Sequence, residues 1–357
     1  MTNFTLFKRL LLATTAGLLL ASPASAEVMG AKVERTGDTK IMVSWSSKTP
    51  VDVYVADVAD AGVAGAKLAS GENKAGKFEI NTGATARPYF YLKDSKDGTV
   101  VEIAERALPL DQGSNFRDVG GYPAAGGKHV RWGAVFRSGG TPMLSEADLA
   151  RIQMLKLTDM VDLRSSEERT VAPTRIENVR YTAIGYSLTK MMAQQGPIDP
   201  TKLGGVYSTF PDFLIPQMRI LFQKLLEDGT TVVYNCSAGQ DRTGFATALL
   251  LYSLGVPRDL IYADYQLSTV YRRPQFEVPK IEPAVAERSE GLKTFASMMN
   301  NPAISKPRPL VDEQQRPFIA GAFAAIEAKW GSVDNYLAKE IGVGPADVVK
   351  LRAKYLE

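Results

Sequence analysis

Short alternating stretches of apolar and polar residues dominate the first third of the chain after residue 27. Alternation with a period of two is typical of strands that bury one face. The predicted strands cover residues 31–33, 41–45, 51–55, 78–80, 89–92 and 99–103, separated by turn signals such as Asp97-Gly98. Six or seven short strands, with Trp45 in an early one, predict a small all-β sandwich over residues 27–108 that resembles a fibronectin type III module by pattern.

The pattern changes after residue 108, where apolar strands alternate with helical periodicity. Residues 131–137, 157–163, 179–184 and 230–234 read as strands. Helices are predicted over residues 145–155, 213–226, 244–254, 258–267, 270–273, 307–329, 332–341 and 345–356. Residues 187–209 fit neither period and are interpreted as a mobile insertion. Strand–helix–strand order implies parallel pairing, so residues 109–357 are predicted to form an α/β domain with a mainly parallel sheet flanked by helices.

The first 26 residues have a different character. Lys8 and Arg9 precede an apolar run over residues 10–20, and Ala24-Ser25-Ala26 offers a small-residue cleavage site before Glu27. This order is typical of a secretory signal peptide, and the run is short for a membrane span. We therefore expect a periplasmic or secreted protein with no stable membrane insertion after cleavage.

Composition and charge narrow the function classes. The net charge is only +3 and no long basic run occurs, so nucleic-acid binding is not expected. A single histidine, His129, argues against a histidine-based metal site or a Ser-His-Asp triad. The single cysteine, Cys236, excludes an internal disulfide, so the thiol of an exported chain is either hidden or used.

The cysteine lies in the most informative stretch of the chain, residues 232–244 (VVYNCSAGQDRTG). It follows a predicted strand and precedes a predicted helix, so loop N–H groups and the helix dipole point at one spot and favour both a bound anion and a thiolate. Arg242 adds a planar fork that matches two phosphate oxygens. The alternative interpretation is that Cys236 is a small buried apolar residue near a strand end.

Five ordered motifs resemble one family. They are residues 115–122 (NFRDVGGY), 136–140 (FRSGG), 162–168 (DLRSSEE), 236–244 (CSAGQDRTG) and a GSVDNYL…LRAKYL tail. The loop resembles the H-C-x5-R-[ST] pattern of cysteine-dependent phosphatases. The full set resembles the secreted bacterial tyrosine phosphatases related to the mycobacterial enzyme, with the loop type C-x-A-G-K-D-R-T-G. The resemblance implies a phosphatase fold for residues 109–357.

The resemblance also implies a mechanism and a site. Cys236 attacks phosphorus without a metal or cofactor, and Arg242 binds the phosphate with the loop residues Ser237, Ala238, Gly239, Gln240 and Asp241. Thr243 donates to the departing sulfur or, alternatively, caps the helix. The expected substrate is a phosphotyrosine protein or a small phosphomonoester.

Two carboxylates compete for the role of general acid. The resemblance favours Asp241, which could instead pair with Arg242 or with backbone. Asp162 stands at a strand end, where α/β sheets present their sites, but could pair with Arg164 or Arg117.

Other charged residues are predicted to be structural. Arg117, Asp118 and Arg137 brace the loop through buried ion pairs, whereas residues 167–169 and 271–273 form solvated faces. The alternative for residues 271–273 is that they bind phosphate.

Two positions depart from the family pattern. Asn235 replaces the histidine before the cysteine and can still bond loop carbonyls. Gln240 replaces a lysine, which removes a cation from the pocket mouth and weakens the case for polyanionic phosphoinositides. A phosphoinositide or inositol-phosphate phosphatase and a non-catalytic phosphate-binding module remain the alternatives.

Overall fold

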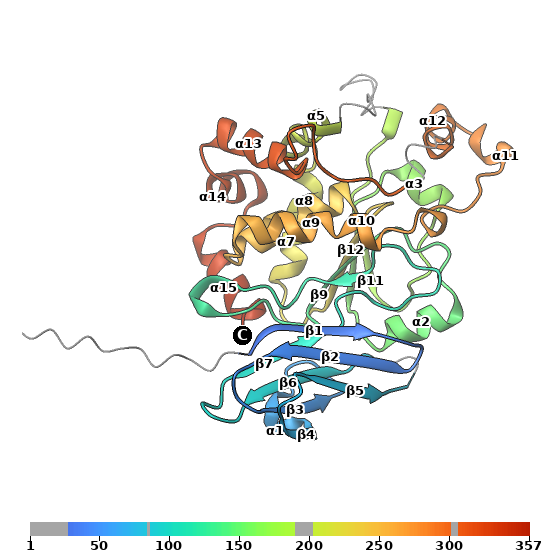
Figure 1. Ribbon diagram of the computed structural model, residues 1–357. Coiled ribbons are helices and arrows are strands. Elements are labelled where there is room, and N and C mark those ends of the chain that lie inside the picture. Colours follow the sequence, from blue (N-terminus) through green and yellow to red (C-terminus); the bar gives the residue numbers. More distant parts are fainter. Residues whose placement is uncertain (1–27, 84–85, 190–202, 301–305) are drawn as a thin grey trace, which may run out of the picture.

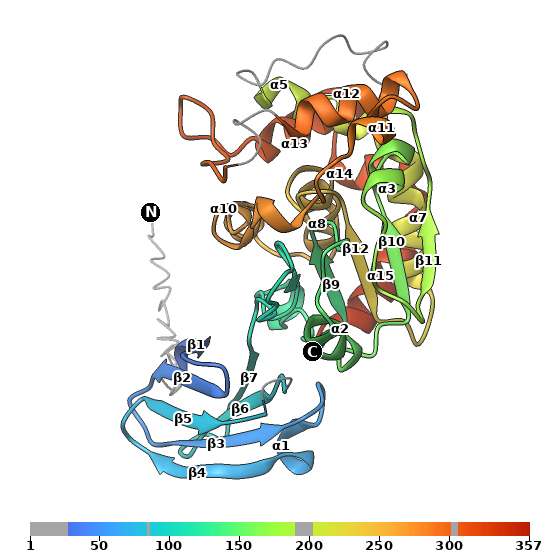
Figure 2. The same ribbon diagram turned by 90° about the vertical axis from the view of Figure 1, so that its right-hand side faces the viewer.

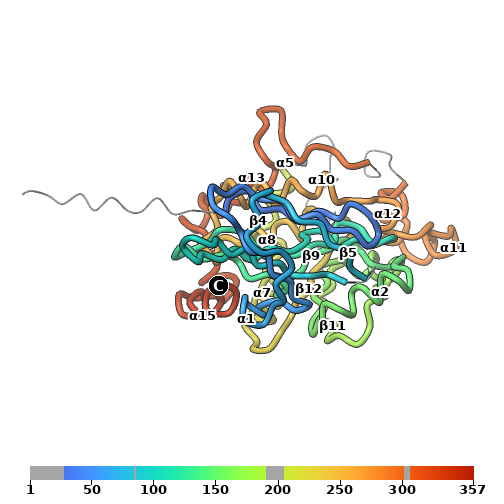
Figure 3. The backbone as a smooth tube through the Cα atoms, turned by 60° about the horizontal axis from the view of Figure 1, so that its bottom comes forward, coloured from blue at the N-terminus to red at the C-terminus, as the bar shows by residue number. Residues whose placement is uncertain are grey.

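The computed structural model describes residues 28–83, 86–189, 203–300 and 306–357, so the predicted signal peptide lies outside the described residues. Two antiparallel sheets come first, and an α/β part with a mixed, mostly parallel sheet follows (Figure 1). Seen from below, the strands of the N-terminal part lie across one end of the α/β part (Figure 3). No helix in the described ranges has the length and apolar character needed to cross a membrane.

Seven strands form the described residues of the N-terminal part. Three form one sheet in the order β1 (Met29–Arg35), β2 (Lys40–Ser46) and β5 (Lys77–Asn81). Four form the other in the order β4 (Lys67–Asn73), β3 (Val51–Ala56), β6 (Tyr89–Asp94) and β7 (Val100–Ala104). Ile41, Val43 and Trp45 from the first sheet share one apolar cluster with Val53 and Phe90 from the second. The alternation that predicted these strands therefore points one face of each sheet into a common core.

One strand of this part was not predicted. β4 has the sequence KLASGEN, in which no residue is β-branched or aromatic. It forms the edge of its sheet by pairing with β3, and a short helix, α1 (Gly62–Gly65), precedes it. Pairing with an existing strand overrides the weak local preference of such a segment.

The α/β part is organised on a five-stranded sheet in the order β11 (Arg180–Ala183), β10 (Asp159–Asp162), β12 (Val232–Asn235), β9 (Val135–Ser138) and β8 (Arg117–Asp118). The first four strands run parallel, and β8 pairs antiparallel with β9. Asp162 and Ser138 lie beside Asn235 in the register. The carboxyl ends of these strands therefore open onto one edge of the sheet.

Helices cover both faces of this sheet (Figure 2). Val232 and Tyr234 of β12 face the larger core, which contains α7 (Ile215–Leu226), α8 (Asp241–Ser253) and α15 (Pro345–Tyr355). Val233 points to the opposite face and packs in a smaller cluster with α2 (Glu146–Gln153). Because both faces are covered, β12 in the middle of the sheet reads as an apolar run, Val232-Val233-Tyr234.

The other α-helices of the described residues are α3 (Ser166–Val171), α5 (Leu203–Tyr207), α6 (Phe210–Phe213), α9 (Arg258–Gln266), α10 (Ser268–Tyr271), α11 (Pro283–Ala286), α12 (Glu290–Met299), α13 (Ile319–Trp330) and α14 (Val333–Tyr336). A π-helical segment, Leu337–Ile341, follows α14. The prediction of a helix over residues 307–329 was wrong in its first half. Pro307, Pro309 and Pro317 interrupt that region, and the helix begins only at Ile319.

Two further predictions need adjustment. α8 begins at Asp241, three residues before the predicted Gly244. In the predicted insertion over residues 187–209, residues 190–202 lie outside the described residues, and Leu203–Tyr207 forms α5.

The two parts of the chain meet through charged and aromatic contacts. Arg87, which precedes β6, forms a buried ion pair with Asp118 of β8 at 2.6 Å. Asp118 also accepts a hydrogen bond from the Gly133 N–H at 2.8 Å. Arg106 lies over the rings of Tyr122 and Trp132. The N-terminal part is thus joined directly to the NFRDVGGY segment.

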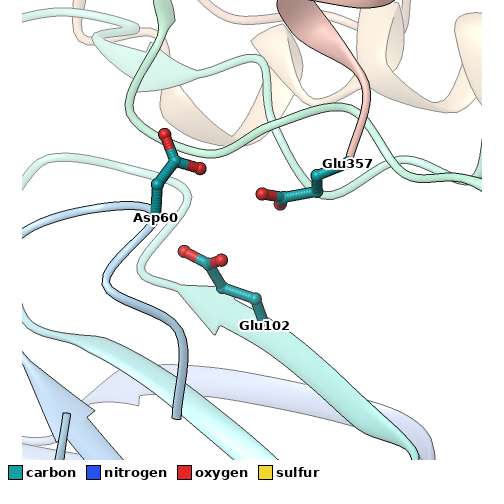
Figure 4. A group of neighbouring side chains, drawn as sticks. All are labelled: Asp60, Glu102 and Glu357. Carbon is teal, nitrogen blue, oxygen red and sulfur yellow. The ribbon is translucent and has the colours of Figure 1, made fainter. Parts of the chain in front are cut away.

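Three carboxylates gather at the same junction. The side chains of Asp60, Glu102 and Glu357 face one another (Figure 4), and Arg131 pairs with Asp60 at 2.9 Å. Burial and the negative charge of Asp60 raise the pKa of Glu102 to about 7. Burial and the charges of Glu102 and Asp60 raise the pKa of Glu357 to about 8.

Candidate active site

The single cysteine lies in the loop that joins β12 to α8. Cys236 follows Asn235, the last residue of β12, and only 1% of its surface is exposed. The loop closes on Gln240, and α8 begins at Asp241. The structure therefore brings Cys236, Arg242, Asp241, Thr243 and the predicted phosphate-binding residues together at the carboxyl edge of the parallel sheet.

Gly239 gives the loop its tight turn. Its φ of +63° is a conformation that residues with a side chain rarely adopt, and a Cβ there would lie 2.5 Å from Ser138 and Gly139 backbone atoms. Only glycine allows this turn to press against the end of β9.

The loop carbonyl groups are held from behind. Asn115 Nδ2 donates to the carbonyls of Ala238 at 3.0 Å and Gly239 at 2.8 Å. Arg137 Nη2 also donates to Gly239 O at 2.8 Å. The Gly140 N–H donates to the Ser237 carbonyl at 2.7 Å.

The opposite side of the loop presents donors. Among the described residues, no acceptor is found for the backbone N–H groups from Ser237 to Thr243. These groups include the first turn of α8, where the helix dipole is positive. Carbonyls tied outward and N–H groups free on the other side make an anion cradle.

A buried ionic network supports the anchors of the loop. Asp264 of α9 accepts hydrogen bonds from Arg137 at 2.5 Å and from Tyr122 at 3.0 Å, and pairs with Arg117 at 3.3 Å. Burial alone would raise the pKa of Asp264, but Arg117 and Arg137 outweigh it and hold that pKa well below its usual range. Burial and the charge of Arg137 lower the pKa of Arg117 to about 10.

These contacts confirm that Arg117, Asp118 and Arg137 form buried ion pairs, and Arg117 and Arg137 also brace the loop. Sequence reasoning missed Asp264, which no motif marks.

Arg242 is held by a carboxylate that sequence analysis placed in solvent. Glu168 of α3 is 3% exposed and accepts from Arg242 Nη2 at 2.6 Å and Nη1 at 2.7 Å. Ser237 Oγ donates to the same carboxylate at 2.7 Å. The prediction of a solvated face over residues 167–169 was therefore wrong for Glu168, which belongs to the loop.

The charges of this pair reinforce each other. Burial would raise the pKa of Glu168, but Arg242 and the hydrogen bonds from Ser237 and Ser165 lower it to about 2. Burial would lower the pKa of Arg242, but Glu168 and Tyr186 raise it well above its usual value. The Tyr186 hydroxyl accepts from Arg242 Nη1 at 2.6 Å. The Nε–H of Arg242 has no acceptor in the described part of the chain and can serve a bound anion.

Counting the described residues only, Asp241 has one occupied and one free carboxylate oxygen. Tyr207 Oη and Gln240 Nε2 both donate to Oδ1, the latter at 3.0 Å. Within the described ranges no donor reaches Oδ2. The expected alternative, a pair between Asp241 and Arg242, does not occur, because Arg242 bonds Glu168 instead.

Asp162, the second candidate acid, is fully engaged. Arg164 binds both of its oxygens at distances of 2.7 to 3.1 Å, and Tyr181 donates to Oδ2 at 2.7 Å. The buried ion pair with Arg164 is one of the two structural partners that the sequence suggested.

Two polar residues near the cysteine were singled out from the sequence: Asn235, which directly precedes it, and Thr243, which follows Arg242. Thr243 lies inside α8, so it is not the helix N-cap, which is Gln240. Its buried hydroxyl has no hydrogen-bond partner in the described residues. Asn235 Nδ2 donates to the Cys236 carbonyl at 3.4 Å, in agreement with the expected contact to a loop carbonyl.

Of the two arginines after α10, Arg272 is buried and Arg273 is half-buried. Arg272 pairs with Glu277 at 2.8 Å, and Ser114 Oγ donates to the same carboxylate at 2.9 Å. Arg273 Nε donates to the Gly113 carbonyl at 2.7 Å. The prediction of a solvated face over residues 271–273 was wrong for these two side chains. They hold the segment just before Asn115, whose side chain binds the loop carbonyls.

Comparison with known proteins identifies relatives of this arrangement. A model of the tyrosine phosphatase family matches residues 108–357. A Cupriavidus necator protein that bears the name tyrosine-protein phosphatase is 35% identical over 258 residues, which cover 70% of this chain and 88% of that protein. The triple specificity protein phosphatase PtpB of Mycobacterium tuberculosis is 27% identical over 291 residues, covering 71% of this chain and all of that protein.

Proposed function

The chain belongs to the tyrosine phosphatase family and is a phosphomonoester hydrolase, and we propose that it is exported and works through a phosphocysteine intermediate. The observation that carries the mechanism is the loop itself. The buried Cys236 thiol lies in a loop whose carbonyls are hydrogen-bonded on the far side. Its N–H groups are without acceptors in the described residues, and the Arg242 guanidinium is held beside it by Glu168. Such a site binds a phosphate dianion and places sulfur behind its phosphorus atom.

The first step forms an S–P bond. The Cys236 thiolate attacks phosphorus while the P–O bond to the leaving group breaks, and that electron pair passes to the leaving oxygen. Asp241 protonates this oxygen through Oδ2, which receives no donor from the described part of the chain. The N–H groups of Ser237–Arg242 and the Arg242 guanidinium hold the three equatorial oxygens.

The second step restores the enzyme. Asp241, now ionised, removes a proton from water as the water oxygen attacks phosphorus, and the S–P electron pair returns to Cys236. Thr243 donates its unpartnered hydroxyl to the departing sulfur. The sum of the two steps is an ester and water converted to an alcohol and phosphate, with no redox change.

Asp241 is preferred over Asp162 as the acid because of their partners. Asp162 is locked to Arg164 and Tyr181. Donors occupy both oxygens of Asp162, so neither is free to present a proton to a substrate, as an acid must.

The proposed substrate is a phosphotyrosine protein or a small aryl phosphomonoester. A broader range of phosphomonoester substrates, phosphoinositides among them, is a second candidate, since the mycobacterial relative bears the name of a triple specificity phosphatase. Gln240, a neutral residue at the loop, supports the first because a polyanionic ring gains most from added cations.

The test of function is hydrolysis of p-nitrophenyl phosphate in EDTA by the wild type and by Cys236→Ser. We expect turnover by the wild type and none by the variant. No turnover by either protein would leave a phosphate-binding module as the better account. Equal turnover by both would refute the cysteine mechanism.

Export is tested separately. Expression of residues 1–357 in a Gram-negative host, followed by fractionation and intact mass measurement, should give a periplasmic protein that begins at Glu27. An unprocessed protein in the cytoplasmic fraction would contradict this part of the proposal.

A further inference from the structure

Two tyrosines and a glutamine form a chain of hydrogen bonds that ends on Oδ1 of Asp241. Tyr265 of α9 donates to the Tyr207 hydroxyl at 2.6 Å, and Tyr207 of α5 donates in turn to Asp241 Oδ1. Gln240 Nε2 adds a second donor to the same oxygen at 3.0 Å. Oδ1 is therefore saturated with donors, while Oδ2 receives none from the described residues.

This asymmetry determines where a proton can reside. A carboxyl oxygen that accepts two hydrogen bonds acts as the carbonyl oxygen of the neutral acid, because a proton on it would face the two donors. The acidic proton then belongs on the other oxygen. From this geometry we propose that Tyr207 and Gln240 are positioning residues that confine the transferable proton of Asp241 to Oδ2, and that Tyr265 holds Tyr207 in place.

The two tyrosines can act as donors over a wide pH range. Burial and the negative charge of Asp241 raise the pKa of Tyr207 and of Tyr265 well above the usual value. The Tyr207 hydroxyl stays protonated while Asp241 gains and loses its proton. The same donor therefore also stabilises the ionised carboxylate that accepts the proton of water in the second step.

Gln240 stands where the family pattern has a lysine, and its amide donates to the acid instead of offering a charge to the substrate. Its side chain is buried and folds back onto the carboxylate that follows it in the chain. A neutral amide donor orients Asp241 without placing a full positive charge beside it. We assign Gln240 to acid orientation rather than to recognition of additional substrate phosphates.

The inference rests on the proposed function, and its test uses the leaving group. A poor leaving group such as phenol needs a proton in the transition state, whereas 2,4-dinitrophenol departs without one. The values of kcat/KM for phenyl, p-nitrophenyl and 2,4-dinitrophenyl phosphate are measured for the full-length wild type, Asp241→Asn, Tyr207→Phe and Tyr265→Phe. Tyr355→Phe is the control, since its buried hydroxyl donates to Leu225 O, away from the loop.

Phenylalanine at position 207 preserves the packing of the ring. The Tyr207 ring contacts Phe210 at 4.9 Å, Tyr265 at 5.8 Å and Phe318 at 5.9 Å between centroids, so only the hydroxyl is lost. We expect Asp241→Asn to slow phenyl phosphate about 100-fold and Tyr207→Phe about tenfold, with much smaller effects on the dinitrophenyl ester. Tyr265→Phe should follow Tyr207→Phe with a smaller loss, and Tyr355→Phe should match the wild type.

Gln240 provides a matched pair of variants. Gln240→Met removes the donor and keeps the length, so it should steepen the dependence on the leaving group. Gln240→Lys restores a donor and should recover most of the phenyl phosphate rate.

Each remaining outcome is decisive. An equal loss on all three esters for Tyr207→Phe would mean that the tyrosine only maintains structure, and no loss on any ester would remove it from the mechanism. Either result overturns the inference. If Asp241→Asn leaves the leaving-group dependence unchanged, the acid is another residue and the inference fails. A wild type that hydrolyses none of the esters refutes the proposed function instead.

Discussion

Replacing Glu168 by glutamine removes the anion that faces Arg242 while keeping the size of the side chain. The pKa of Glu168 is lowered from 4.5 to about 2 because Arg242 and the hydrogen bonds from Ser237 and Ser165 outweigh the effect of burial. One pKa unit corresponds to about 1.4 kcal/mol, so the ionised carboxylate contributes about 3 kcal/mol to folding. This falls at the lower end of the cost of breaking a buried ion pair, about 3–5 kcal/mol.

The sign of the pH dependence follows from the lowered pKa. The contribution is complete above the unfolded pKa of about 4.5 and is lost as the pH falls towards 2, where Glu168 takes up a proton in the folded state. At pH 7, Glu168→Gln should therefore be less stable than the wild type by about 3 kcal/mol. The difference should shrink progressively between pH 4.5 and pH 2.

The assay is urea unfolding across this pH range, together with hydrolysis of aryl phosphates. Glu167→Gln is the matched control, since it removes the same charge one residue earlier and Glu167 bonds Ser187 and Leu188 instead. Because Arg242 loses its partner, kcat/KM should fall by a similar factor for good and poor leaving groups. If Glu168→Gln is as stable as Glu167→Gln at pH 7, the ion pair does not hold the loop and the reasoning fails.

Three further predictions follow from the contacts around the loop and at the junction of the two parts. Gly239→Ala should abolish activity and destabilise the protein in urea, because its Cβ meets backbone at 2.5 Å, whereas Gly229→Ala shares the positive φ but meets no atom within 4 Å; equal stability of the two variants would contradict this. Glu357 has a raised pKa, so its contribution to stability is lost as the pH rises through about 8. Glu357→Gln should have a higher melting temperature than the wild type at pH 9 and the same melting temperature at pH 4. Identical melting curves at pH 9 would refute the raised pKa of Glu357. Arg87→Met leaves Asp118 buried without its cation and should cost about 3–5 kcal/mol of urea stability. In a double-mutant cycle with Asp118→Asn, simple additivity would show that the pair does not couple the two parts.

The parts of the site that could be predicted from the sequence lie close together in the chain. Cys236, Asp241 and Arg242 fall in one strand–loop–helix segment, where the period of apolar residues and the spacing of cysteine and arginine indicate an anion site. The local chain supplies the N–H groups and the thiol, so no distant contact is needed to infer them.

The residues that orient these groups could not be found in this way. Glu168 is 74 residues from Arg242, and Tyr207 is 34 residues from Asp241. A glutamate in the first turn of a short helix has the same pattern whether it faces solvent or a buried arginine. Only the register of β10 beside β12 places α3 over the loop, and register depends on tertiary packing.

The fold shows the same division between local and distant determinants. Strands with alternating β-branched residues were predicted to within a few residues, because that pattern reports burial on one face. β4 was missed because an edge strand can form on the hydrogen bonds of its neighbour alone. The false helix start near residue 307 arose from an apolar period that three prolines interrupt.

The loop is supported by three separate sets of contacts, and each controls a different property. Asn115, Arg137 and the Gly140 N–H fix the carbonyls, so they control the shape of the anion cradle. Glu168 fixes the Arg242 fork, so it controls the charge that all substrates share.

In the proposed mechanism, the third set, the donors to Asp241, acts on the proton that passes to the leaving group and on the proton that comes from water. Because the loop carbonyls are already held from behind, the loop can keep its shape with Asn235 in place of a histidine. The side chain of Asn235 makes one long hydrogen bond, to the Cys236 carbonyl. The substitution at Gln240 has a different consequence, because that side chain belongs to the set that orients the acid. The two departures from the family pattern therefore differ in kind. The first is compensated by neighbouring donors, and in the proposed mechanism the second keeps a donor to Asp241 without the charge of a lysine.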